Sequence, residues 1–269
     1  MNALFAFPHF FFLVSVLTAL SALRAESTVD RRVSRAAYLV GVFFAALFLA
    51  AGWLRAANFV TTDFRSGIAL SIVILGGVYA IAQRKFELGM APAFLSMVCL
   101  ALGAVGSVQF GASAKLAAQT ASHALIGHTF FLFIGLAAFS LSFLFSLLFI
   151  GQDYLIRKKI IERLFFELPP LEITSKLVFA SFISGTAAFL LGLGGGFLEW
   201  HRLRGGARFF ADPAVGISCA VLVAYLAVLF LKLGPLGRTR RFAFASLVLY
   251  SALITAFLTG HHALRGGWW

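Results

Sequence analysis

Residues 123–150 read HALIGHTFFLFIGLAAFSLSFLFSLLFI, a run that contains no Asp, Glu, Lys or Arg. A helix of about 20 apolar residues crosses the hydrocarbon core of a bilayer, so this run by itself predicts a transmembrane helix. Similar runs recur along the whole chain, with only short polar breaks between them. We therefore predict an all-α membrane helix bundle of about eight spans, at residues 3–23, 36–57, 66–83, 91–110, 123–150, 175–198, 214–231 and 242–262.

The composition of the chain excludes an ordinary water-soluble fold. Of its 269 residues, 61% are hydrophobic and 12% are charged, and the mean hydropathy is +0.96. Soluble domains carry roughly 25% charged residues. We predict a single membrane domain over residues 1–269, without a soluble appendage. The net charge of +12 does not indicate a nucleic-acid partner, because the Lys and Arg residues lie in the short breaks between apolar runs.

The basic residues also predict an orientation. Fifteen of the twenty-two Lys and Arg residues fall in the breaks after spans one, three, five and seven. Because cytoplasmic loops carry the excess of Lys and Arg, both termini are expected outside, in a bacterial cytoplasmic (inner) membrane. The first run has no Lys or Arg before Arg24, so we expect a retained helix rather than a signal peptide. Arg55, near the outer end of span two, is expected to reach outward or to pair with Asn58 or Asp63.

Neither thiol chemistry nor catalysis is indicated by the sequence. Cys99 and Cys219 lie singly inside apolar runs and form no CxxC pair. The acidic and basic groups do not gather with a His or Ser into a catalytic constellation, which argues against an enzyme.

Two features of span six and of the break before it predict structural roles. Gly192 and Gly196 form a GxxxG pair near the end of that span, and this spacing favours close helix packing rather than phosphate binding. The break at 157–174 is basic and amphipathic, and we expect it to lie in the membrane interface, with Thr174 or Ser175 capping span six.

All six histidines fall on the predicted outer side of the membrane. They are His9, His123, His128, His201, His261 and His262. Imidazole at such a depth serves interfacial hydrogen bonding, proton handling, or ligation of a metal or haem iron. The loop at 199–213 adds cations and aromatic rings, namely Arg202, Arg204, Arg208, Phe209 and Phe210. Axial ligands, cations for propionates and flat apolar side chains are what a haem needs. Interfacial histidines beside a solvated loop are the alternative.

The order of these features resembles the cytochrome c assembly superfamily of haem-handling membrane proteins, which includes the HemX-like members. In that family an outer His opens one helix pair, an outer loop ends in WGxxWxWDP, and a second outer His closes another helix pair. Here His123 opens spans five and six, GGARFFADP runs from 205 to 213, and GHH at 260–262 follows the last span. The similarity covers residues 120–265, a four-helix core with its outer loop at 199–213, and extends to four divergent helices at 1–110 only in hydropathy.

Individual loop positions carry the resemblance. Gly206, Asp212 and Pro213 match the loop motif, and Phe209 keeps an aromatic residue where the family has Trp. The family segment YAxxLHxR is similar to YLAVLFLK at 225–232, where a Phe stands at the place of the inner-half histidine. The resemblance therefore implies an outer site only.

What the resemblance implies is a haem-handling accessory membrane protein with a role in cytochrome c-type biogenesis. His123 and His262 would ligate the haem iron, and His128 and His261 are weaker candidates for that role. The other cofactor-binding residues would be Arg202, Arg204, Arg208, Phe209 and Asp212, with the arginines pairing with the propionates. The implied partners are the lipid bilayer and other membrane subunits or cytochrome assembly proteins.

Two further hypotheses come from other classes of protein. The chain could be a non-catalytic structural subunit of a larger membrane complex that kept the fold without the cofactor. A small-solute transporter is less favoured, because no inverted repeat relates spans one to four and five to eight.

If the haem hypothesis holds, His123 and His262 should approach each other across one outer cavity beneath the 199–213 loop. His128 is five residues from His123, which turns it about 140° around a helix, so only one of these two can face a given pocket.

Overall fold

The computed structural model describes residues 2–25, 28–55, 64–84, 90–107, 123–159, 169–204, 213–233 and 239–263. The described part of the chain is all-helical, as predicted, and forms eight α-helices. In chain order they are α1 (Asn2–Ala25), α2 (Thr28–Arg55), α4 (Phe64–Ala82), α5 (Ala91–Ser107), α7 (His123–Lys158), α9 (Leu171–Arg204), α10 (Pro213–Leu233) and α11 (Thr239–Ala263).

Six of these helices are long and apolar enough to cross a membrane, judged by length and composition. They are α1, α2, α4, α7, α9 and α10, whereas α5 is apolar but only 17 residues long. The structure therefore confirms the all-helical fold and shows six helices that are suited to span a membrane. The total of eight spans and the outer location of both termini remain predictions.

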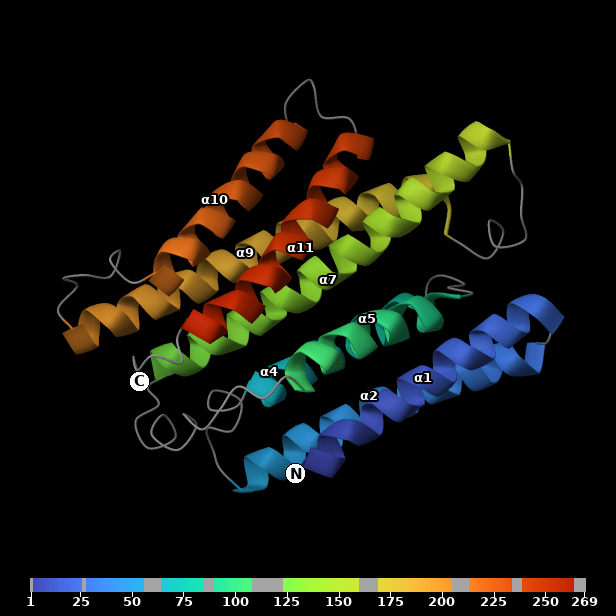
Figure 1. Cartoon of the computed structure of the whole chain (residues 1–269), viewed down its shortest axis with the longest axis horizontal. Helices are drawn as coiled ribbons and strands as arrows, with labels where there is room; N and C mark the ends of the chain where they lie inside the picture. Colours follow the sequence, from blue (N-terminus) through green and yellow to red (C-terminus); the bar gives the residue numbers. More distant parts are fainter. Residues whose placement is uncertain are drawn as a thin grey trace.

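Consecutive helices run in opposite directions. Figure 1 shows the start of α7, the end of α9, the start of α10 and the end of α11 at one end of the bundle, near the start of α1. We call this end the histidine end, because all six histidines belong to these helix segments. The histidines lie near the start of α1 or α7, or near the end of α9 or α11. Because consecutive helices alternate in direction, these four helix ends all lie at the same end of the bundle.

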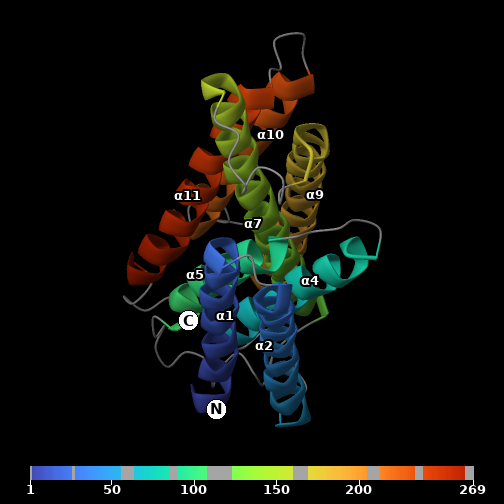
Figure 2. The ribbon, with the colours of Figure 1, turned by 90° about the vertical axis from the view of Figure 1, so that its right-hand side faces the viewer.

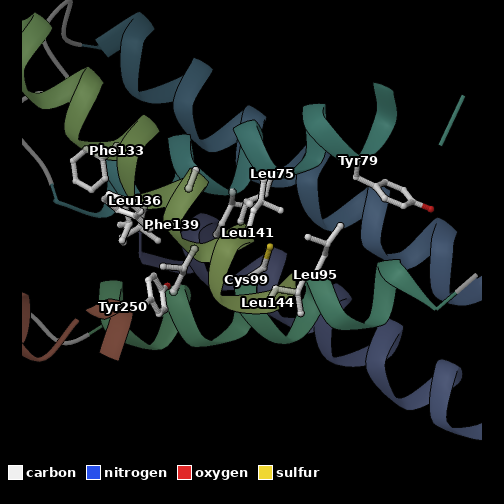
Figure 3. Packing of buried hydrophobic residues seen from close by; sticks show 14 of the residues in the cluster. Leu75, Tyr79, Leu95, Cys99, Phe133, Leu136, Phe139, Leu141, Leu144 and Tyr250 are labelled. Atoms are coloured by element: carbon white, nitrogen blue, oxygen red, sulfur yellow. The ribbon is translucent and has the colours of Figure 1, made fainter. Parts of the chain in front are cut away.

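Helices α4 and α5 lie between the α1–α2 pair and the α7–α9 pair, which the two views of Figures 1 and 2 show together. One cluster of buried side chains includes residues of all eight helices. The fully buried Cys99 of α5 belongs to this cluster together with Leu75 of α4, Leu144 of α7 and Tyr250 of α11 (Figure 3). The eight described helices therefore share one core.

Glycines let the helices approach closely at their crossings. A Cβ atom on Gly192 would lie 2.8 Å from Cδ2 of Leu132, and one on Gly196 would lie 2.7 Å from Nδ1 of His128. The close packing predicted for this GxxxG pair is therefore confirmed, and α7 and α9 form the most extensive helix pair of the bundle.

Buried hydroxyl groups join the helices at mid-length. The Ser140 hydroxyl on α7 and the Tyr250 hydroxyl on α11 are hydrogen-bonded at 2.8 Å. Four residues earlier on α11, the Ser246 hydroxyl is paired with the Ser142 hydroxyl of α7 at 2.9 Å. Hydrogen bonds of this kind between helices hold bundles together in lipid, where water does not compete for the polar groups.

The helices extend beyond the spans that hydropathy predicts, because hydropathy detects only their apolar middle. The helix α2 begins at Thr28, before the predicted residue 36. Its first turn is tied to α1 by the Ser21 hydroxyl, which donates to Asp30 Oδ2 at 2.7 Å. An acidic residue in a first turn is stabilised by the helix dipole. Hydropathy does not register such contacts.

The expected cap of span six is wrong. Helix α9 begins at Leu171, directly after two prolines, so Thr174 lies inside the first turn and not before it. Its backbone N–H donates to Pro170 O at 2.9 Å, and its hydroxyl donates to Pro169 O at 3.3 Å. Proline has no N–H to lose at a helix start, which explains why the helix begins there. Residues 160–168 of the predicted interfacial segment lie outside the described residues.

Candidate functional site at the histidine end of helices α7 and α9

Most residues of the predicted haem site have side chains that lie outside the described part of the structure. His123 opens α7, and His261 and His262 lie in the last turn of α11, so their helices place them at the histidine end. Arg202 and Arg204 belong to the last turn of α9. The remaining site residues, Arg208, Phe209 and Asp212, lie outside the described residues, as do the side chain of Arg55 and the whole of Asn58 and Asp63.

The imidazole of His128 is fixed between α7 and α9. Its Nδ1 donates a hydrogen bond to the carbonyl oxygen of Gly192 over 2.7 Å. The ring lies against Gly196, where any Cβ atom would come within 2.8 Å of its Cε1. Because a carbonyl oxygen only accepts, the hydrogen lies on Nδ1, and Nε2 of the neutral ring carries the lone pair.

A groove of about 550 Å³ lies beside this histidine, between α7 and α9. Its lining is apolar apart from one imidazole, and consists of Gly127, His128, Phe131, Leu190, Leu191, Gly194, Gly195, Phe197 and Leu198. Two of its glycines face open space, because a Cβ atom on Gly127 or Gly194 would have no neighbour within 4 Å. The groove thus offers flat backbone, aromatic and aliphatic surface, and one nitrogen that can ligate a metal.

The other two histidines with described side chains do not line the groove. His9 on α1 lies over Gly103 of α5, with the Phe5 ring at 5.1 Å and the Phe12 ring at 6.4 Å between centroids. Its Nε2 is buried and has no hydrogen-bond partner among the described residues. This histidine fills a packing site.

His201 on α9 is exposed, and its ring centroid is 6.3 Å from that of Phe197, a groove residue. It therefore lies close to the groove but does not line it. Of the three described histidines, His128 is the one that lies in a site able to hold a ligand.

Glu199 is a residue that our sequence reasoning missed. It lies near the end of α9, three residues after Gly196, and is only 6% exposed. An acidic residue within a membrane span is rare and usually functional. Its position directly after the apolar run GGGFL is the signal that could have found it.

A protein-only metal centre is not formed by the residues that the structure describes, since no three His, Cys, Asp or Glu side chains gather there. A haem iron has a different requirement, because one imidazole is a sufficient protein ligand in globins and peroxidases.

The sequence matches no protein-family model, and comparisons with curated proteins and with solved structures also find no match.

Proposed function

We propose that this chain is a haem-handling accessory membrane protein of the HemX-like kind, with its site at the outer face of a bacterial inner membrane. The observation that carries the proposal is the hydrogen bond from His128 Nδ1 to Gly192 O beside an apolar groove. It raises His128 from a weaker candidate to the first candidate for the iron ligand.

The hydrogen bond prepares the imidazole for ligation. Metal-ligating histidines almost always donate their second ring N–H to a carbonyl, a carboxylate or water, which fixes the tautomer and the ring orientation. In His128 the backbone of α9 supplies that acceptor, so Nε2 can ligate without a rearrangement of the ring. The glycines of α9 permit this contact, because a larger residue at 196 would collide with the ring.

The groove supplies the apolar part of a haem site. Phe131, Phe197 and the leucines would cover the macrocycle, and Arg202 and Arg204, further along α9, would pair with its propionates. His123 cannot share the groove with His128, because the two point about 140° apart on α7. We propose that His128 is the one imidazole ligand in the groove. Ligation by His123 and His262 together is the alternative hypothesis.

An absorption titration of the purified protein with haemin tests this proposal. We expect a shifted Soret band for the wild type and its loss in His128→Ala, with recovery when free imidazole is added. His201→Ala is the matched control, because it removes an exposed imidazole from the same end of α9. If the wild type does not change the haemin spectrum, the protein does not handle haem. If His123→Ala and His262→Ala abolish the band and His128→Ala does not, the iron ligands are His123 and His262, as the family resemblance implies.

A structural subunit of a larger membrane complex is the second candidate function, and one observation favours it. Among the described side chains of α10, Tyr225 is the one that is buried, while Val223, Phe230 and Leu231 are largely exposed. A partner subunit, such as a cytochrome assembly protein, could cover this helix. Sizing of the protein extracted in native nanodiscs tests the idea, because a mass that fits one chain with its lipid belt would exclude a stable complex.

A further inference from the structure

We infer that the groove between α7 and α9 admits a flat, largely apolar ligand sideways, from the outer leaflet of the membrane. The inference rests on the proposed function, because haem is one member of this class of ligand. It adds the route of access and the shape that the groove selects. The site is the one lined by His128 and the open glycines Gly127 and Gly194.

The mouth of the groove lies on the lipid-facing side of a spanning helix. Leu190, Leu191 and Leu198 line the groove and are 51%, 56% and 65% exposed. All three belong to the apolar span Leu171–Glu199. Large apolar side chains exposed at this depth face lipid, so a ligand that passes between them comes from the hydrocarbon and not from the aqueous loops.

The groove is kept open by glycines that helix packing does not require. Gly192 and Gly196 are needed because Leu132 and His128 occupy the space of their side chains, but a Cβ on Gly127 or Gly194 would meet nothing. Glycine lowers the stability of a helix relative to alanine. Gly127 and Gly194 therefore leave the backbone of both walls of the groove open to close approach by a ligand.

The lining selects the chemistry of the ligand. His128 is the one polar side chain among the nine lining residues, so the body of the ligand must be apolar. Any charged groups must stay at the histidine end, where Arg202 and Arg204 continue α9. An acyl chain would fit the apolar walls but would leave the prepared imidazole unused. A planar amphiphile with its charges at one edge fits the apolar walls, and an iron-containing tetrapyrrole would use the imidazole as well.

Metal-free protoporphyrin IX is the probe that separates this inference from iron ligation. Its fluorescence anisotropy is measured with the full chain reconstituted in phosphatidylcholine vesicles that already contain the porphyrin, and again with the porphyrin supplied in water on albumin. We expect rapid binding from the bilayer and slow binding from albumin. Gly194→Trp should fill the groove and weaken binding at least tenfold. Gly77→Trp is the matched control, because its Cβ also meets nothing but lies on α4.

Two further variants make every outcome decisive. Gly127→Trp fills the groove from the opposite wall, so a misfolded Gly194→Trp, detected by gel filtration, does not end the test. His128→Ala should keep protoporphyrin binding, because the probe has no iron to ligate. Binding that survives both Trp substitutions, or that is as fast from albumin as from the bilayer, would overturn the inference. Protoporphyrin binding without a haemin spectral shift would reject the proposed iron ligation and leave the lateral groove standing.

Discussion

The imidazole of His9 on α1 occupies the space that a side chain on Gly103 of α5 would need. The contact fixes the position of α1 against α5, with Phe5 and Phe12 on either side of the imidazole. It also separates two histidines of the same end by role, since His9 packs against a helix whereas His128 lines a groove.

Gly103→Ala should destabilise the bundle, because the new methyl group collides with the His9 ring. Overpacking of this kind costs about 1–3 kcal/mol, so we expect a clear fall in the Tm of the purified protein in detergent. Gly77→Ala is the control and should leave the Tm unchanged or raise it, because a Cβ there meets nothing. The double variant His9→Ala/Gly103→Ala should recover part of the loss. A Gly103→Ala protein as stable as the wild type would show that α1 does not lie on α5 in this way.

Tyr250→Phe should lower stability, whereas Tyr225→Phe should not. The Tyr250 hydroxyl is bonded to Ser140 at 2.8 Å, and the buried Tyr225 hydroxyl has no hydrogen-bond partner among the described residues. Hydrogen bonds between membrane helices contribute about 0.6 kcal/mol on average. Thermal unfolding of both variants under the same conditions provides the comparison. Equal losses in the two would mean that the hydroxyl pair between α7 and α11 contributes nothing.

Gln152→Ala should loosen the start of α9. The Gln152 side chain is almost fully buried and its Nε2 donates to Pro169 O at 2.8 Å, which ties the end of α7 to the segment two residues before α9. Loss of one hydrogen bond costs about 0.5–1.5 kcal/mol, because Pro169 O keeps the Thr174 hydroxyl as a donor. Limited proteolysis between α7 and α9 should become faster. Ser175→Ala is the control. It removes an exposed hydroxyl that donates to Glu172 O, and this variant should be cleaved at the wild-type rate.

Reporter fusions should place both termini outside the cytoplasm. This prediction comes from the fifteen basic residues in alternate breaks, and it agrees with the antiparallel order of the helices. Two reporters are fused in turn to each terminus: a phosphatase that is active only outside the cytoplasm, and a fluorescent protein that is fluorescent only inside it. The two reporters give opposite signals for a given location of the terminus. A cytoplasmic signal at one end alone would mean an odd number of crossings, with the 17-residue α5 as the first candidate for a segment that does not cross.

The sequence by itself determined the membrane environment, the helical class and the end of the bundle at which the histidines gather. Hydropathy detects these features because every backbone polar group in lipid must be satisfied within its own helix, which makes the length of each apolar run decisive. The extra turns of α2 and α9 were not predicted, because their first residues are polar and are held by Asp30 and by the Pro169–Pro170 carbonyls.

Only the tertiary structure decided which side chain meets which helix. A span that is apolar on every side has no polar face to mark its orientation, so hydropathy could not show which of the six histidines meets a neighbouring helix. That choice depends on where glycines let backbones approach: Gly196 places the His128 ring beside a groove, and Gly103 buries the His9 ring in a packing contact. Both are contacts between residues more than sixty positions apart, and no local pattern along the chain records them.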